Sequence, residues 1–141
     1  MIFSAEDLFS EDQALTASAA STNYYDNGAH GTVLGAPSAL DYANEATMIP
    51  IEVVSTLAAG GTSPTLTVKV QSDDNTSFSS ATDVTPEYSI GTAAGSRLSL
   101  QVLPENINER YFRLYYTLGG TSPTFTVTAG VVGARQANYL S

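Results

Sequence analysis

Apolar residues recur at every second position along much of this chain. In five segments, Ile, Leu, Val, Phe, Tyr or Ala mostly alternate with polar residues: 49–53, 66–70, 98–102, 112–116 and 125–131. Successive side chains of a β-strand point to opposite faces, so this spacing predicts strands with one apolar and one polar face. Such strands favour antiparallel pairing, because strands of a buried parallel sheet are apolar on both faces. No segment shows a convincing helical face.

The connections between these segments indicate the fold class. Two clusters of turn-forming residues, 71–78 and 104–109, separate short predicted strands. The chain has 141 residues, which is enough for a single domain core. We therefore expect an all-β fold, an antiparallel β-sandwich of jelly-roll type.

One sequence motif occurs twice. Gly-Gly-Thr-Ser-Pro-Thr followed by a β-rich run is found at residues 60–65 and again at residues 119–124. Gly-Gly supplies the positive φ of a tight turn, and proline is tolerated where a strand begins. Each copy therefore predicts a hairpin, and two equivalent binding loops are the alternative interpretation.

The first twenty residues differ from the rest. Apart from Leu15, small residues fill positions 14–20, and the few large apolar side chains before them stand among acidic residues. This pattern favours an extended N-terminal arm over residues 1–20, followed by a jelly-roll β-sandwich domain over residues 21–141. The same stretch holds Ser10-Glu11-Asp12-Gln13, which also matches a helix capping box. In the arm, the candidate interface residues are Phe3, Leu8 and Phe9.

The charge of the chain restricts its partners. Five Lys and Arg residues against fourteen Asp and Glu residues give a formal net charge of −9. Phosphate backbones and anionic lipid surfaces would repel such a chain, so we expect neither nucleic acid nor membrane as a partner. The N-terminal residues show no signal peptide, and we expect no secretion.

Groups for catalysis are sparse. The chain has no cysteine and one histidine, His30, which lies in a turn-like context and is interpreted as a surface loop residue. The acidic residues nominate no particular catalytic pair. The Asp73-Asp74-Asn75-Thr76 cluster lacks the spacing of a calcium loop. We therefore expect no enzyme activity, no cofactor and no metal.

Adjacent tyrosines provide candidates for an exposed surface. In the pairs Tyr24-Tyr25 and Tyr115-Tyr116, the two rings should face opposite sides of a strand, so at most one of each pair is free. Tyr111, Arg113 and Tyr115 should share one side of a strand, and these residue types are enriched at interface hot spots. The triplet is interpreted either as an interface or as sheet surface covered by a neighbouring segment.

Several segments occur in an order that resembles a known family. They are residues 8–19 (LFSEDQALTASA), residues 21–23 (STN), residues 70–73 (VQSD), residues 110–116 (RYFRLYY) and residues 120–130 (GTSPTFTVTAG). Together they resemble the capsid cement proteins of tailed bacteriophages. The resemblance covers most of the chain and is weakest between Gly28 and Met48.

The resemblance implies a jelly-roll subunit on the outer surface of the assembled virion capsid, made in the host cytoplasm. Its partners would be the major capsid protein and further copies of itself, with a homodimer favoured over a trimer. Such a protein stabilises contacts between neighbouring capsomers. The alternatives are a tail or fibre β-module and a carbohydrate-binding jelly roll.

Overall fold

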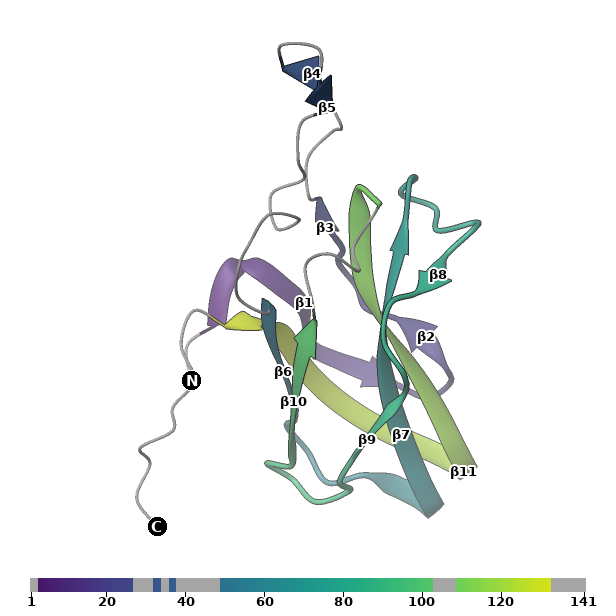
Figure 1. Cartoon of the computed structure of the whole chain (residues 1–141). Helices are drawn as coiled ribbons and strands as arrows, with labels where there is room; N and C mark the ends of the chain where they lie inside the picture. Colours follow the sequence, from purple (N-terminus) through teal and green to yellow (C-terminus); the bar gives the residue numbers. More distant parts are fainter. Residues whose placement is uncertain (1–2, 27–31, 34–35, 38–48, 103–108, 133–141) are drawn as a thin grey trace.

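The computed structural model describes residues 3–26, 32–33, 36–37, 49–102 and 109–132 (Figure 1). All regular elements in these ranges are β-strands. They are β1 (Phe3–Leu15), β2 (Ala19–Ala20), β3 (Tyr25–Asp26), β4 (Thr32–Val33), β5 (Ala36–Pro37), β6 (Ile49–Ser55), β7 (Gly60–Asp73), β8 (Thr82–Asp83), β9 (Tyr88–Ile90), β10 (Arg97–Val102) and β11 (Tyr111–Val132). The described part of the chain contains no helix that could span a membrane.

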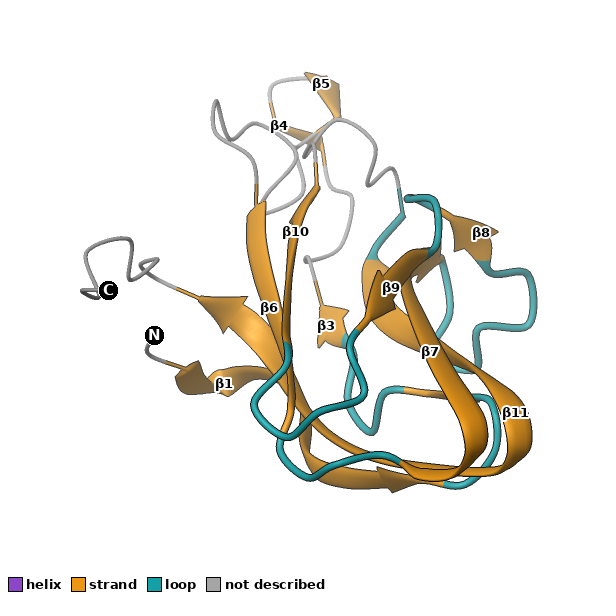
Figure 2. Cartoon of the chain, turned by 90° about the horizontal axis from the view of Figure 1, so that it is seen from below, coloured by secondary structure: helices purple, strands orange, loops and turns teal. Residues whose placement is uncertain are grey.

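The 22-residue strand β11 organises the fold. The main path of hydrogen-bonded neighbours is β10-β6-β11-β7-β8, and all pairings are antiparallel. The first half of β11 pairs with β2, β3 and β7, whereas its second half pairs with β1 and β6. β11 thus belongs to both halves of one curled sheet (Figure 2). The predicted fold class, an all-β antiparallel β-sandwich of jelly-roll type, is confirmed.

The core lies inside the curl of this sheet. The alternation of the sequence places one side of each strand there, as in β11, where Phe112, Leu114 and Tyr116 are fully buried. The same holds for Val68 and Val70 of β7, which pair with β11. Apolar residues from both halves of the sheet therefore form a single cluster.

One polar contact crosses this core. The hydroxyl groups of Ser10 and Tyr116 share a buried hydrogen bond of 2.8 Å. Burial raises the pKa of Tyr116 well above its ordinary value, although the bond with Ser10 opposes this shift. Tyr116 therefore stays neutral, and its hydroxyl has the partner that a buried polar group requires.

The repeated motif has a different role from the predicted hairpins. Its two copies pair with each other, because Gly60 lies opposite Thr124 and Gly119 lies opposite Thr65. The register shifts between these pairs, and in each copy the second glycine and the serine have positive φ. The expectation of two separate hairpins is therefore wrong. The two motifs form one matched irregularity at which the long strands β7 and β11 bend together (Figure 2).

The N-terminal segment also differs from the expected arm. Residues 3–15 are extended, but they form β1, which pairs with the second half of β11. Phe9 and Leu15 are almost completely buried in the core of their own chain, and the Phe9 ring lies 5.7 Å from that of Phe112. The reason is that β11 continues past the bend and offers this segment both backbone partners and an apolar face. In this structure β1 is a strand of the domain.

Candidate functional site

The outer side of the β7–β11 sheet gathers cationic and aromatic side chains. Residues paired in an antiparallel sheet point to the same side, and Tyr115 pairs with Lys69 while Arg113 pairs with Gln71. We call this surface the cation–aromatic face. It comprises Tyr24, Lys69, Gln71, Phe78, Arg110, Tyr111, Arg113 and Tyr115.

The face concentrates positive charge in an acidic chain. The sequence has five Lys and Arg residues, and the structure describes Lys69, Arg97, Arg110 and Arg113. All of these except Arg97 belong to the face, and each lies close to an aromatic ring. Contacts of this kind are attractive because the face of an aromatic ring carries negative potential.

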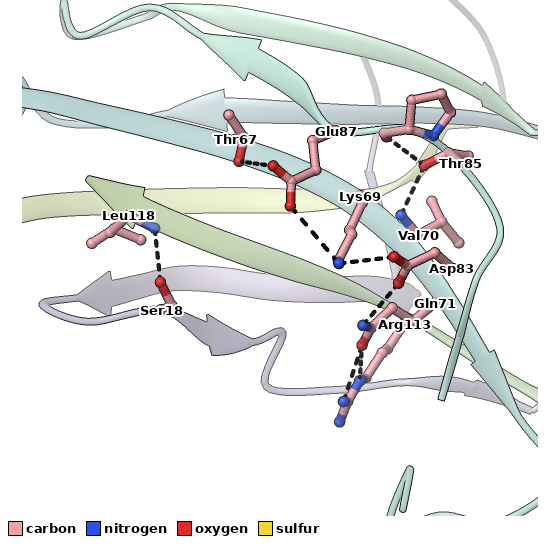
Figure 3. Close-up of polar contacts among 11 residues, drawn as sticks. Ser18, Thr67, Lys69, Val70, Gln71, Asp83, Thr85, Glu87, Arg113 and Leu118 are labelled. Carbon is pink, nitrogen blue, oxygen red and sulfur yellow. Dashed lines mark hydrogen bonds and ion pairs between the residues drawn. The ribbon is translucent and has the colours of Figure 1, made fainter. Parts of the chain in front are cut away.

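Lys69 is bound to acidic groups of its own chain. Its Nζ lies 3.0 Å from Oδ2 of Asp83 and 3.8 Å from Oε1 of Glu87 (Figure 3). The hydrogen bond with Asp83 raises the pKa of Lys69 and lowers that of Asp83. The same Nζ lies 5.7 Å from the centre of the Tyr115 ring. The charge of Lys69 is therefore largely satisfied within the protein.

Arg110 has a similar internal partner. Its Nε and Nη2 donate to the two carboxylate oxygens of Asp26, at 2.8 and 2.9 Å. This bidentate bond raises the pKa of Arg110, and the guanidinium also lies 5.0 Å from the Tyr111 ring. Tyr24 packs edge-on against Tyr111 at 5.3 Å and remains 45% exposed.

Arg113 is held differently. Its Nε and Nη2 both donate to Oε1 of Gln71, which is a neutral acceptor (Figure 3). Its Cζ lies 4.1 Å from the centre of the Phe78 ring and 6.0 Å from that of Tyr115. Burial lowers the pKa of Arg113, and the charges of Tyr115 and Asp73 oppose this shift only in part.

A hydrogen-bonded turn positions Phe78 beneath Arg113. The buried carboxylate of Asp73 accepts bonds from the backbone N–H groups of Ser80 and Asn75 and from both of their side chains. Asn75 in turn accepts a bond from the backbone N–H of Ser77. Phe78 adopts a positive φ of 51°, which is unfavourable for a bulky residue. The turn therefore imposes a strained backbone that directs an aromatic ring to the face.

The predicted interface residues fall into two groups. Tyr111, Arg113 and Tyr115 are half-buried and share one side of β11. In β1, Leu8 is half-buried, whereas Phe9 is 1% exposed and faces the core. Phe9 is therefore not available to a partner in this fold. The backbone of Phe3 pairs with Val132, and its side chain lies outside the described part.

The two tyrosine pairs are oriented as predicted, with one ring of each pair on either side of the chain. Tyr116 is buried and Tyr115 half-buried, and Tyr24 is exposed while the Tyr25 ring lies 5.1 Å from that of Phe112. The roles of Lys69, Gln71 and Phe78 in the face were missed. The register of β7 against β11, which places Lys69 and Gln71, is absent from local sequence patterns.

The other chemical candidates lie elsewhere. His30 falls outside the described residues. Within the described ranges, no three His, Cys, Asp or Glu side chains are arranged to hold a metal ion. The Asp73 cluster instead organises the turn that carries Phe78. The cation–aromatic face is therefore our candidate site, and its residue types are those that dominate binding energy at protein interfaces.

Comparison with known protein families identifies a match over most of the chain. A family model described as Bbp16 matches residues 9–135, a range that includes the whole cation–aromatic face. Bbp16 is a phage-related bacterial family. A search of curated proteins found no match to this chain.

Proposed function

Because the chain belongs to the Bbp16 family, we propose that it is a phage capsid cement protein that binds the outside of the assembled head. In this role it holds neighbouring capsomers together without catalysing a reaction. A phage-related family and an all-β fold of jelly-roll type both support the proposal, as does the ordered sequence resemblance to cement proteins.

The observation that carries the proposal is the cation–aromatic face. A chain of net charge −9 places most of its described cations beside Phe and Tyr rings on one side of a sheet. This combination is suited to binding a protein surface, since Arg and Tyr supply much of the energy at interfaces. Lys69, Arg113 and Tyr115 are the residues we expect to contact the major capsid protein.

Stabilisation follows from thermodynamic linkage. A protein that binds the assembled shell but not separate capsomers favours assembly by RT ln(1 + [L]/Kd) for each site. At a free concentration of a hundred times Kd this amounts to about 2.7 kcal/mol per site. Because the contribution repeats over the whole shell, moderate affinity is sufficient. Self-association as a homodimer, favoured over a trimer, would add a second tethered contact.

The test uses heads of the encoding phage from which this protein has been removed. Purified protein should bind at a saturating ratio to the major capsid protein and raise the temperature at which the heads release DNA. Absence of binding would refute the proposal, and saturable binding without increased resistance would refute the stabilising role. Binding to tails or to glycans instead would favour a fibre module or a carbohydrate-binding protein.

A pair of tyrosine variants locates the contact. Tyr115→Ala removes a ring from the cation–aromatic face and should weaken binding to heads. Tyr88→Ala is the matched control, because Tyr88 is 42% exposed but pairs with Val68, whose side chain points to the opposite side of β7. Equal binding of both variants would place the capsid contact elsewhere on the molecule.

A further inference from the structure

The geometry points to Arg113 as the residue that binds a carboxylate side chain of the shell protein, an inference that rests on the proposed function. Arg113 lies at the centre of the cation–aromatic face, between the Phe78 and Tyr115 rings. Its contacts differ from those of the other two cations of the face.

The first difference is the charge of its partner. Lys69 and Arg110 are within 4.0 Å of carboxylates of their own chain, whereas no described carboxylate lies within that distance of Arg113. Its described hydrogen bonds all go to Oε1 of Gln71, a neutral acceptor that receives two N–H groups. A guanidinium has five N–H donors. Arg113 therefore retains both its charge and unused donors for an external acceptor.

The second difference is that its position is fixed in advance. The Gln71 oxygen holds Nε and Nη2 on one edge, and the Phe78 ring lies 4.1 Å below the guanidinium carbon. Phe78 is itself held in a strained conformation by the Asp73 turn. Binding therefore costs little side-chain entropy, whereas immobilising a long, flexible cationic side chain is usually unfavourable.

The third difference is partial removal from water. Burial lowers the pKa of Arg113, so its charged form is less well solvated than that of a fully exposed arginine. An anion brought by a partner would restore favourable interactions that water supplies incompletely. Charge-assisted bonds of this kind are about twice as strong as neutral ones.

Charge also favours a carboxylate over a polyanion. A planar guanidinium matches a carboxylate or a phosphate equally well in shape. However, a chain of net charge −9 would repel a nucleic acid or an anionic lipid surface over the whole contact. A single acidic side chain on a protein surface avoids this penalty and fits the small unsatisfied site at Arg113.

The test is a series of substitutions at position 113, with binding to stripped heads as the readout. We expect affinity to fall in the order Arg, Lys, Gln, Glu, with a loss of at least about tenfold for Arg113→Gln. Lysine keeps the charge but not the fork, and glutamate repels the carboxylate. Equal losses for Arg113→Gln and Arg113→Glu would show that only stacking matters, and would overturn the inference.

A charge-matched double variant guards against misfolding at position 113. In Gln71→Glu with Asp83→Asn, the amide and the carboxylate exchange places, so the net charge is unchanged. The two side chains still present an amide beside a carboxylate, as in the wild type, where Gln71 donates to Asp83 at 3.2 Å. The new carboxylate neutralises Arg113 internally, so binding should fall although the fold is kept. Arg97→Gln on β10 is the control and should bind as the wild type does. Asp83→Asn alone removes the carboxylate bound to Lys69, so it is the reference against which binding of the double variant is compared.

The outcomes separate this inference from the proposed function. If wild-type protein binds heads and the double variant binds as well as Asp83→Asn alone, Arg113 is not the anchor, but the cement role stands. If wild-type protein does not bind heads, the proposed function itself fails. Loss of self-association in Arg113→Gln with unchanged binding to heads would assign the carboxylate to a second copy of the chain, against the inference.

Discussion

Replacing Phe9 by alanine tests whether β1 belongs to the domain core. Phe9 is 1% exposed. Its ring packs against Phe112, which lies in the first half of β11, whereas β1 pairs with the second half. Burying a phenylalanine removes at least about 150 Å² from water, and at about 25 cal/mol per Å² this contributes about 4 kcal/mol. Buried Phe→Ala substitutions cost about 3–5 kcal/mol, a large share of the roughly 5–15 kcal/mol that stabilises a domain.

The assay is equilibrium unfolding in urea, followed by circular dichroism and by tyrosine fluorescence, since the chain has 8 Tyr and 0 Trp. We expect the free energy of unfolding to fall by about 3–5 kcal/mol and the melting temperature by about 10 °C or more. Glu11→Ala, at an exposed position of the same strand, is the control and should change stability by less than about 0.5 kcal/mol. A similarly small change for Phe9→Ala would refute the assignment of β1 to the core.

Two further predictions concern the bend and the turn. Gly120→Ala should destabilise the protein more than Gly95→Ala. Both glycines have positive φ, so both substitutions strain the backbone. At Gly120 the new Cβ atom would also lie 2.5 Å from the carbonyl oxygen of Ser63, whereas at Gly95 it would meet nothing within 4 Å. Equal urea midpoints for the two variants would contradict this role of the bend. Burial alone would raise the pKa of Asp73, but its hydrogen bonds with Ser80, Asp74 and Asn75 outweigh burial and lower the pKa below 3.8. The ionised form of Asp73 therefore stabilises the fold above that pH. This contribution is lost as the pH falls through the lower pKa of the native state. Asp73→Asn should therefore reduce the loss of stability on acidification, and unfolding curves at neutral and acidic pH that keep the wild-type difference would exclude this contribution.

The sequence by itself determined the fold class and which side of an individual strand points to the core. Alternation is a local property, so Phe112, Leu114 and Tyr116 could be assigned to the side opposite Tyr111, Arg113 and Tyr115 without knowing any neighbour. The same rule separated the two members of each tyrosine pair. It also grouped three residues of the candidate face on a single strand.

Only the tertiary structure decided which segments are neighbours. The two Gly-Gly-Thr-Ser-Pro-Thr motifs pair with each other, and β1 pairs with the last half of β11, more than a hundred positions away in the sequence. Phe78 reaches Arg113 through a turn closed by Asp73, and Gln71 reaches it through strand register. Local periodicity cannot specify these contacts, because any strand with one apolar face can pair with any other. The choice among partners depends on how all the apolar faces are buried together.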